Sequence, residues 1–305
     1  MASQIPPLLE SYLSLPPETS QIVLTGILGA STNWLTLRYL YSLLRPATAA
    51  TRLDRDGDAD GAGEDFKVLL VSFMRDYSFW KEGAGRLGLN LDTLAARGRF
   101  LFVDGLSRLF LGGGNGTAAP PAGPGPGPGR HQQRQQQHQQ QHLLYLDSPH
   151  LADAAKVFGT AVERLQAAGG KIILILDQPD VLLAAASPGD GVTGTAWKDV
   201  VLGLREASAE QQVHATLLTL SADEPLVSAQ TTALEKEHAA FLLSLAHEAE
   251  AVLSLRLLDT GMAKDVSGVV RITGGGVHMD RVIEEHEYLY HVGGDGVVKV
   301  FERGQ

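Results

Sequence analysis

The chain contains no cysteine among its 305 residues, so disulfides, zinc–thiolate sites and thiol catalysis are excluded. Positive charge is scarce as well. Lysine and arginine total 25, against 35 aspartates and glutamates, which gives a formal net charge of −10. Affinity for nucleic acid depends mainly on neutralising phosphates, so we expect such a chain to bind nucleic acid poorly on its own. Partners would have to supply much of the positive field.

Long apolar runs are also missing. No stretch reaches the roughly 18 consecutive apolar residues that a membrane-spanning helix needs, so no membrane segment is predicted. The N-terminal segment contains Glu10 and Glu18 and has no basic region before an apolar stretch, so it lacks the pattern of a secretory signal. With 44% hydrophobic residues the chain can nevertheless bury a full core.

Strands and helices are expected to alternate through most of the chain. Strands are predicted at 21–25, 68–73, 99–107, 171–177 and 213–220, and helices at 7–15, 32–44, from about 75 to Arg97, 150–168, 195–208 and 229–248. Four consecutive strands are then expected at 250–258, 268–273, 286–292 and 297–302, with glycine-rich turns. This order predicts an α/β three-layer domain with a mostly parallel central sheet and C-terminal antiparallel hairpins.

Two segments interrupt this pattern. Residues 46–65 are rich in Asp, Gly and Ala and are predicted to be a flexible connector. Their alternating aspartates superficially match a calcium loop, but the glycine and glutamate of such a loop are missing. Residues 111–142 are rich in glycine, proline and glutamine, and this composition predicts a disordered insertion. Because the alternation resumes after the insertion, residues 1–305 are predicted to form a single domain.

The most informative segment is a degenerate phosphate-binding loop. Residues 22–33 read IVLTGILGASTN, in the strand, glycine loop, helix layout of the motif G-x-x-x-x-G-K-[ST]. Counting from Gly26, the second glycine is replaced by Ser31, the lysine by Thr32 and the hydroxyl residue by Asn33. Ser31 adds a Cβ where the loop is expected to need positive φ, and Thr32 brings no cation to the phosphates. The alternative is that the glycines only form a turn between strand and helix.

Further candidate residues follow the predicted strands. Asp177 ends the apolar strand KIILILD, at the position of the magnesium-organising carboxylate in a P-loop ATPase, and Asp104 ends the strand before it. Without the phosphate-binding lysine, structural roles are favoured for both aspartates. The sequence therefore predicts no catalytic residue, no bound cofactor and no metal site.

A cluster rich in arginine and aromatic residues follows the second strand. It comprises Arg75, Asp76, Tyr77, Phe79 and Trp80. Arginine, tyrosine and tryptophan are enriched at subunit interfaces, which favours a contact with another chain. The alternative is that Phe79 and Trp80 pack into the core while Arg75 and Asp76 cap a helix.

Residues 69–110, LLVSFMRDYSFWKEGAGRLGLNLDTLAARGRFLFVDGLSRLF, resemble the sixth subunit of the Elongator complex. The resemblance rests on the Arg-Asp-Tyr/aromatic-Trp cluster, a Gly-Leu-x-Leu-x-x-Leu helix and an Arg-Phe-x-Phe-Val-Asp-Gly-Leu strand. It covers most of the chain, is looser after residue 180, and departs from the family at 46–65 and 111–142.

The resemblance implies a RecA-like domain that lacks the nucleotide-binding signature. Such subunits assemble with the fourth and fifth Elongator subunits into a hetero-hexameric ring in the cytoplasm and nucleus. The ring binds tRNA and supports modification of the wobble uridine, U34, while the catalytic chemistry lies in another subunit. Two other functions stay open on the sequence alone: a RecA-like ATPase with an atypical loop, and a RecA-like scaffold of another assembly, such as a recombination-mediator complex.

Overall fold

The computed structural model describes residues 4–45, 66–109, 142–167, 169–186, 189–206, 213–258, 261, 263–276 and 283–303. The predicted connector at 46–65 lies outside the described residues. So does the predicted insertion at 111–142, apart from its last residue.

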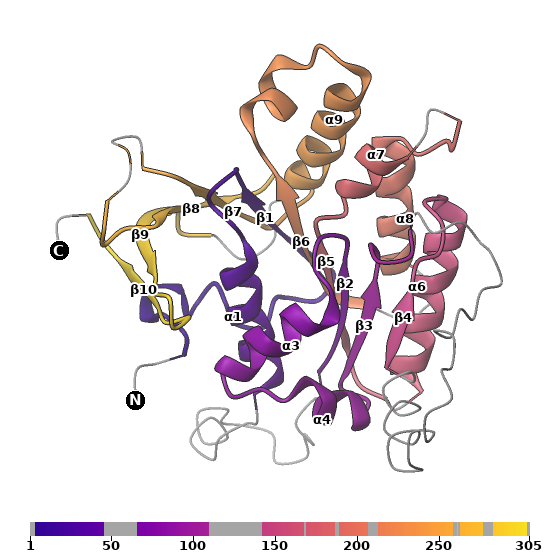
Figure 1. Ribbon diagram of the computed structural model, residues 1–305, viewed down its shortest axis with the longest axis horizontal. Coiled ribbons are helices and arrows are strands. Elements are labelled where there is room, and N and C mark those ends of the chain that lie inside the picture. The colour runs from indigo at the N-terminus through magenta and orange to yellow at the C-terminus, as the bar shows by residue number, and fades with distance from the viewer. Residues whose placement is uncertain are drawn as a thin grey trace, which may run out of the picture.

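The centre of the molecule is a ten-stranded sheet of order β10-β9-β8-β7-β1-β6-β5-β2-β3-β4 (Figure 1). The strands from β4 to β7 in this order run parallel, and β8, β9 and β10 continue the sheet in antiparallel fashion. The strands are β1 Ser20–Gly26, β2 Lys67–Ser72, β3 Phe100–Asp104, β4 Leu143–Tyr145, β5 Ile172–Asp177, β6 Val213–Ser221, β7 Ala251–Arg256, β8 Gly268–Gly274, β9 His286–Val292 and β10 Val298–Phe301. The predicted fold class, a mostly parallel sheet with C-terminal antiparallel strands, is confirmed.

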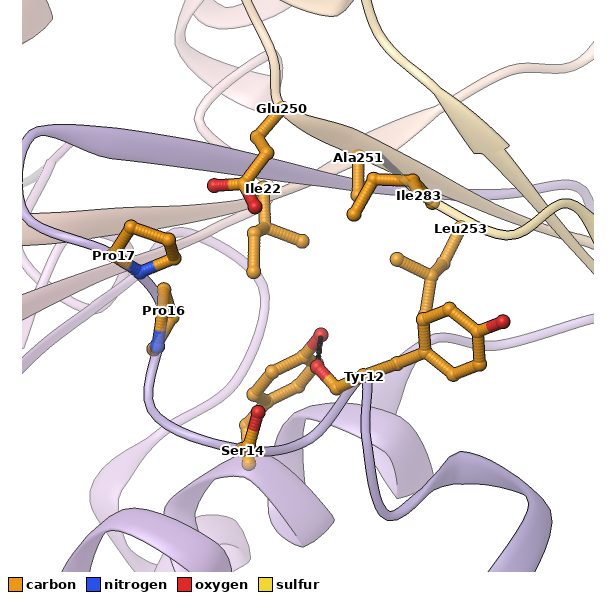
Figure 2. Close-up of a pocket in the computed structure, with 10 residues that line it drawn as sticks. Tyr12, Ser14, Pro16, Pro17, Ile22, Glu250, Ala251, Leu253 and Ile283 are labelled. Atoms are coloured by element: carbon orange, nitrogen blue, oxygen red, sulfur yellow. Dashed lines mark hydrogen bonds between the residues drawn. The ribbon is translucent and has the colours of Figure 1, made fainter. Parts of the chain in front are cut away.

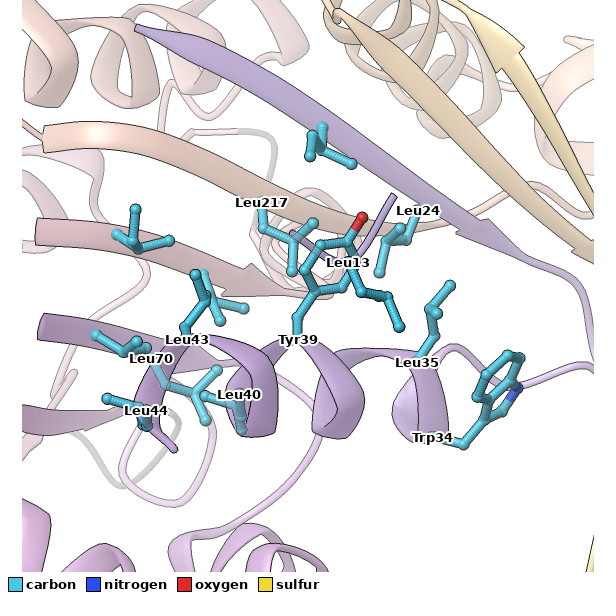
Figure 3. Packing of buried hydrophobic residues seen from close by; sticks show 14 of the residues in the cluster. Leu13, Leu24, Trp34, Leu35, Tyr39, Leu40, Leu43, Leu44, Leu70 and Leu217 are labelled. Atoms are coloured by element: carbon cyan, nitrogen blue, oxygen red, sulfur yellow. The ribbon is translucent and has the colours of Figure 1, made fainter. Parts of the chain in front are cut away.

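Helices cover both faces of the parallel strands, which explains why β5 is apolar at five successive positions and buried throughout. The helices are η1 Pro7–Leu9, α1 Asn33–Leu44, α3 Tyr77–Arg86, α4 Leu91–Ala96, α6 Leu151–Gln166, α7 Val181–Ala185, α8 Gly194–Glu206, the π-helical turn η2 Pro225–Ala229 and α9 Ala233–His247. One apolar core forms beneath α1, α3 and α4, and a second forms beneath α6, α8 and α9. Figure 3 shows Leu35, Tyr39 and Leu43 of α1 pointing into the first core.

Several local predictions are corrected by the structure. The single helix expected to end near Arg97 is two helices, because Gly88 takes φ 84° and ends the first of them. The helix expected at 7–15 is only the 3₁₀ turn η1. The short strand β4 and the short helix α7 were not predicted, since three and five residues are too few to show a period.

A small cavity lies at the amino ends of β1 and β7 (Figure 2). Tyr12, Pro16, Ile22, Glu250 and Leu253 are among the residues that line it. Its volume of about 10 Å³ is close to the minimum that one water molecule requires, so it is too small for a nucleotide. Among the described residues, no helix combines the length and the apolar character needed to cross a bilayer.

Candidate functional site

The candidate site lies at the carboxyl edge of the sheet, where β1, β6 and β5 are adjacent and parallel. Open α/β sheets bind ligands outside the carboxyl ends of their strands. Here that edge brings together the loop after β1, Asp177 at the end of β5, and Ser221 at the end of β6. These residues are close in space although nearly 200 positions separate the first from the last.

The loop between β1 and α1 is a tight turn. Ile27 and Ala30 form an isolated antiparallel bridge, and the amide of Ala30 donates to the carbonyl of Ile27 at 2.8 Å. A Cβ on Gly26 would lie only 2.7 Å from the Ala30 carbonyl oxygen, so this position requires glycine. The left-handed residue is Gly29, with φ 92°. Ser31 does not have positive φ, so the backbone strain predicted there is absent.

Two further amides of this loop donate to side-chain acceptors in the same chain. The amide of Leu28 donates to Asp223 Oδ1 at 2.8 Å, and the amide of Asn33 donates to Ser31 Oγ at 3.2 Å. The contact with Asp223 places a carboxylate where a phosphate group would have to approach. Like charges repel, so this arrangement disfavours an anionic ligand.

Thr32, at the position of the motif's lysine, is buried. Its methyl group lies 3.2 Å from the place of a Cβ on Gly26, so the side chain points into the fold instead of toward a ligand. Its carbonyl accepts from the amides of Leu35 and Thr36 at 3.0 Å, which starts α1. Residue 32 therefore contributes to folding, and it offers no cation at the mouth of the loop.

Asp177 is fully buried and is held by two hydroxyl groups. Ser72 Oγ donates to its Oδ2 at 2.7 Å, and Thr219 Oγ1 donates to its Oδ1 at 2.9 Å. Burial raises the pKa of Asp177 to about 6, and the two hydroxyl groups oppose this rise without cancelling it. The side chain thus has the surroundings of a structural carboxyl group that bridges β2, β5 and β6.

A buried polar network beside Asp177 was not predicted from the sequence. Gln178 has a left-handed backbone, with φ 54°, and its side-chain Oε1 accepts from Ser221 Oγ at 2.8 Å. Asp180 Oδ2 accepts from the amide of Ser221 at 3.1 Å and lies 3.8 Å from His238 Nδ1. The other ring nitrogen of His238, Nε2, is 2.7 Å from the Ser221 carbonyl oxygen.

This geometry indicates where protons reside. Because a carbonyl oxygen only accepts, Nε2 of His238 carries a proton, and Nδ1 faces the buried carboxyl group of Asp180. Burial raises the pKa of Asp180, and the facing His238 ring opposes that rise. Hydrogen bonds to His238 on α9 and to Asp180 in the turn after β5 therefore hold Ser221 in place. The residues that follow it, Ala222 and Asp223, contact the loop after β1.

The cluster after β2 divides into a buried part and an exposed part. Trp80 is completely buried in the first core, and Asp76 caps α3 by accepting from the amide of Phe79 at 3.0 Å. Arg75 is exposed, with its guanidinium carbon 5.0 Å from the centre of the Phe79 ring. Tyr77 is half-buried and donates to Asp92 Oδ1 at 2.7 Å. A role at a subunit interface stays a prediction for Arg75 and Tyr77.

Asp104 caps the turn that follows β3. Its Oδ1 accepts from the amides of Leu106 and Ser107, at 3.0 and 2.8 Å, and its Oδ2 accepts from Ser107 Oγ at 2.7 Å. These hydrogen bonds all lie within its own turn. Across the described residues, no group of three or more histidine, cysteine or acidic side chains is arranged to hold a metal ion.

Replacing Asp76 by alanine is expected to destabilise the protein by about 1 kcal/mol, because a helix N-cap contributes about 0.5–2 kcal/mol. The hydrogen bonds from Ser78 and from the Phe79 amide lower the pKa of Asp76, so the loss should shrink as the carboxylate is protonated in acid. Urea unfolding at pH 7 measures the change. Ser78→Ala is the matched control, since Ser78 contacts Asp76 but caps no backbone amide. Equal losses in both variants would show that the cap is not the cause.

Comparison with solved structures identifies the class of fold. A crystal structure of a KaiC-like protein from the hyperthermophilic archaeon Pyrococcus horikoshii matches with a TM-score of 0.52 at 13% identity, over 99% of this chain and 98% of that one. The chain therefore has the KaiC-like, RecA-type fold of P-loop ATPases, and at this identity the likeness shows the fold alone. No protein-family model and no curated protein matches the sequence.

Proposed function

We propose that this chain is a non-catalytic RecA-fold subunit of a larger assembly. The observation that carries the proposal is the state of the loop from Gly26 to Asn33. It has the length and position of a phosphate-binding loop, yet its lysine position is a buried threonine and its Leu28 amide binds the carboxylate of Asp223. A lysine-to-phosphate hydrogen bond is worth about 1.5–3 kcal/mol, which corresponds to roughly a tenfold to hundredfold loss of affinity.

The assembly we propose is the accessory ring of Elongator. The support is the sequence resemblance at 69–110, whose segment forms β2, α3, α4 and β3 and the turn after them. In that role the chain would join the fourth and fifth Elongator subunits in a hetero-hexamer, in the cytoplasm and nucleus. It would support tRNA binding and wobble-uridine modification without performing the chemistry.

The purified chain is expected not to hydrolyse ATP, because it presents no cation to the β- and γ-phosphates. Phosphate release and binding of a fluorescent ATP analogue should both stay at the level of a buffer blank. The matched control is Asp177→Ala, which should leave this baseline unchanged. Turnover above background that Asp177→Ala abolishes would identify an active ATPase with an atypical loop and would contradict the proposal.

Affinity purification from cells tests the partners. Recovery of the fourth and fifth Elongator subunits in amounts comparable to this chain is the expected result. Recovery of a different set of RecA-like proteins would instead assign the chain to another assembly, such as a recombination-mediator complex. An Arg75→Ala variant adds a test of the exposed part of the cluster, since Arg75 forms no ion pair within the described residues and its loss should change partner recovery more than stability.

A further inference from the structure

The antiparallel strands β8, β9 and β10 have one face that joins neither core. Val270, Ile272, Tyr288, Tyr290 and Val298 all point into the first core. Strand residues alternate between faces, so their sequence neighbours point to the opposite side. No residue of these three strands belongs to the second core, which forms beneath α6, α8 and α9. In Figure 1 the strands lie at the end of the sheet away from α6 and α8.

This opposite face, which we call the outer face, carries an excess of positive charge. The strand pairing aligns Arg271 with Ser254 on one side and with Glu287 on the other, and it aligns Lys299 with His291. Arg256 and Arg303 both contact Glu287, at 3.2 and 2.8 Å. The outer face therefore holds four cations, namely Arg256, Arg271, Lys299 and Arg303. Within the described strands β7 to β10, Glu287 is the one carboxylate that faces the same way.

Two of these cations are available to a ligand. Arg271 and Lys299 are exposed, and neither forms an ion pair within the part of the chain that the structure describes. A local excess of cations is unusual in a chain whose formal net charge is −10. Charged side chains that stay unpaired on an otherwise acidic protein mark a surface suited to an anionic partner.

We propose that the outer face binds the phosphate backbone of RNA. The arginine fork bonds phosphate oxygens bidentately. Arg271 on β8 and Lys299 on β10 lie on either side of β9, two strand spacings of about 4.8 Å apart across the sheet, and so stand at separate points along a bound strand. Phe301 and His291 lie half-buried on the same face, where their rings offer a platform for unpaired bases. An acidic protein segment would use the charges but not these rings, so RNA fits better.

The choice of RNA as the anionic partner of the outer face rests on the proposed function. The number of unpaired cations on this face sets the expected strength of binding. Arg256 and Arg303 are already paired with Glu287, so only about two cations release counterions fully. For single strands the slope of log K against log salt is about −0.7 per neutralised phosphate, which predicts a slope of roughly −1.5. Binding by the chain alone should be weak, and several subunits on one tRNA would raise the avidity.

The test uses the full chain and a fluorescently labelled, unstructured RNA oligonucleotide, with tRNA as a second probe, at low salt. Arg271→Glu/Lys299→Glu should weaken RNA binding at least tenfold and flatten the salt dependence. The matched control is Arg97→Glu/Lys156→Glu, which makes the same change in net charge at exposed positions near α4 and on α6. The control should change affinity less than threefold. Melting curves should show that both double variants fold.

Equal losses in the two double variants would overturn the proposal, because they would show a dependence on net charge alone. Unchanged binding in Arg271→Glu/Lys299→Glu would overturn it as well. A polyglutamate peptide that displaces the RNA at equal charge concentration would assign the face to an acidic protein instead. All these measurements use the isolated chain, so they are independent of partner recovery. The Elongator proposal can fail while RNA binding by the outer face is observed, and RNA binding can be absent while the Elongator subunits are recovered.

Discussion

Trp80→Ala is expected to lower the free energy of unfolding by about 3–5 kcal/mol, the usual cost of removing a large aromatic side chain from a core. Trp80 is completely buried and meets the ring of Phe79 edge-on, with the ring centres 5.3 Å apart. The site cannot collapse easily, because α3 already packs closely on α1: a Cβ on Gly83 would lie 2.7 Å from Leu37. Chemical denaturation at pH 7 measures the change.

Two further variants, Trp80→Phe and Arg75→Ala, separate the contribution of the buried tryptophan to stability from that of the exposed arginine. Trp80→Phe should cost less than Trp80→Ala, because it retains most of the ring and removes an indole N–H that is buried with no hydrogen-bond partner in the described structure. Arg75→Ala should lower the free energy of unfolding by no more than about 1 kcal/mol, since an exposed cation–π contact contributes about 0.5–1 kcal/mol. If Trp80→Ala unfolds at the same denaturant concentration as the wild type, the tryptophan does not belong to the core.

Asp177→Asn is expected to stabilise the protein at pH 8, by about 2 kcal/mol. The pKa of Asp177 rises from 3.8 to about 6 on folding. A pKa difference of one between the unfolded and folded states corresponds to about 1.36 kcal/mol, so the charged form costs about 3 kcal/mol. Asparagine removes that cost. One of the hydroxyl groups of Ser72 and Thr219 must then turn to accept a hydrogen bond from the new amide, which returns about 1 kcal/mol.

The direction of the pKa shift of Asp177 determines how the stability difference between Asp177→Asn and the wild type depends on pH. A carboxyl group whose pKa is raised on folding contributes stability below its unfolded value, and that contribution is lost as the pH rises through the folded value. The difference between Asp177→Asn and the wild type should therefore be small near pH 4 and grow until about pH 7. Thr219→Val is a useful comparison, because it removes one of the hydroxyl groups and should destabilise the protein. An Asp177→Asn variant that is less stable than the wild type at pH 8 would contradict the assigned pKa.

Sequence patterns were sufficient for the architecture because the fold depends on local signals of high contrast. The run from Ile172 to Leu176 is apolar at every position, which is typical of a strand covered on both faces. Near the C-terminus, short strands separated by glycine-rich turns are typical of hairpins. Elements too short to show a period, such as β4, could not be found in this way. The break between α3 and α4 depends on the conformation of Gly88, and the residues around it continue the helical pattern.

The candidate site was harder to predict because its contacts join distant positions. Asp177, Asp104 and the degenerate loop were located from their places at strand ends. Asp180, His238 and Asp223 were not, since each acquires its role only by facing a residue of another element, between 17 and 195 positions away. The left-handed Gln178 gave no signal either, because glutamine is not a residue that favours this conformation.

The hydrogen bond between Asp223 and the Leu28 amide has a consequence for any attempt to build phosphate binding into this loop. Thr32→Lys alone would change a buried position whose side chain points into the fold. The carboxylate of Asp223 would still hold the Leu28 amide and would repel an incoming phosphate. Phosphate binding would therefore require at least a second change, at Asp223. Two residues that follow different strands, β1 and β6, thus keep the loop in its present state.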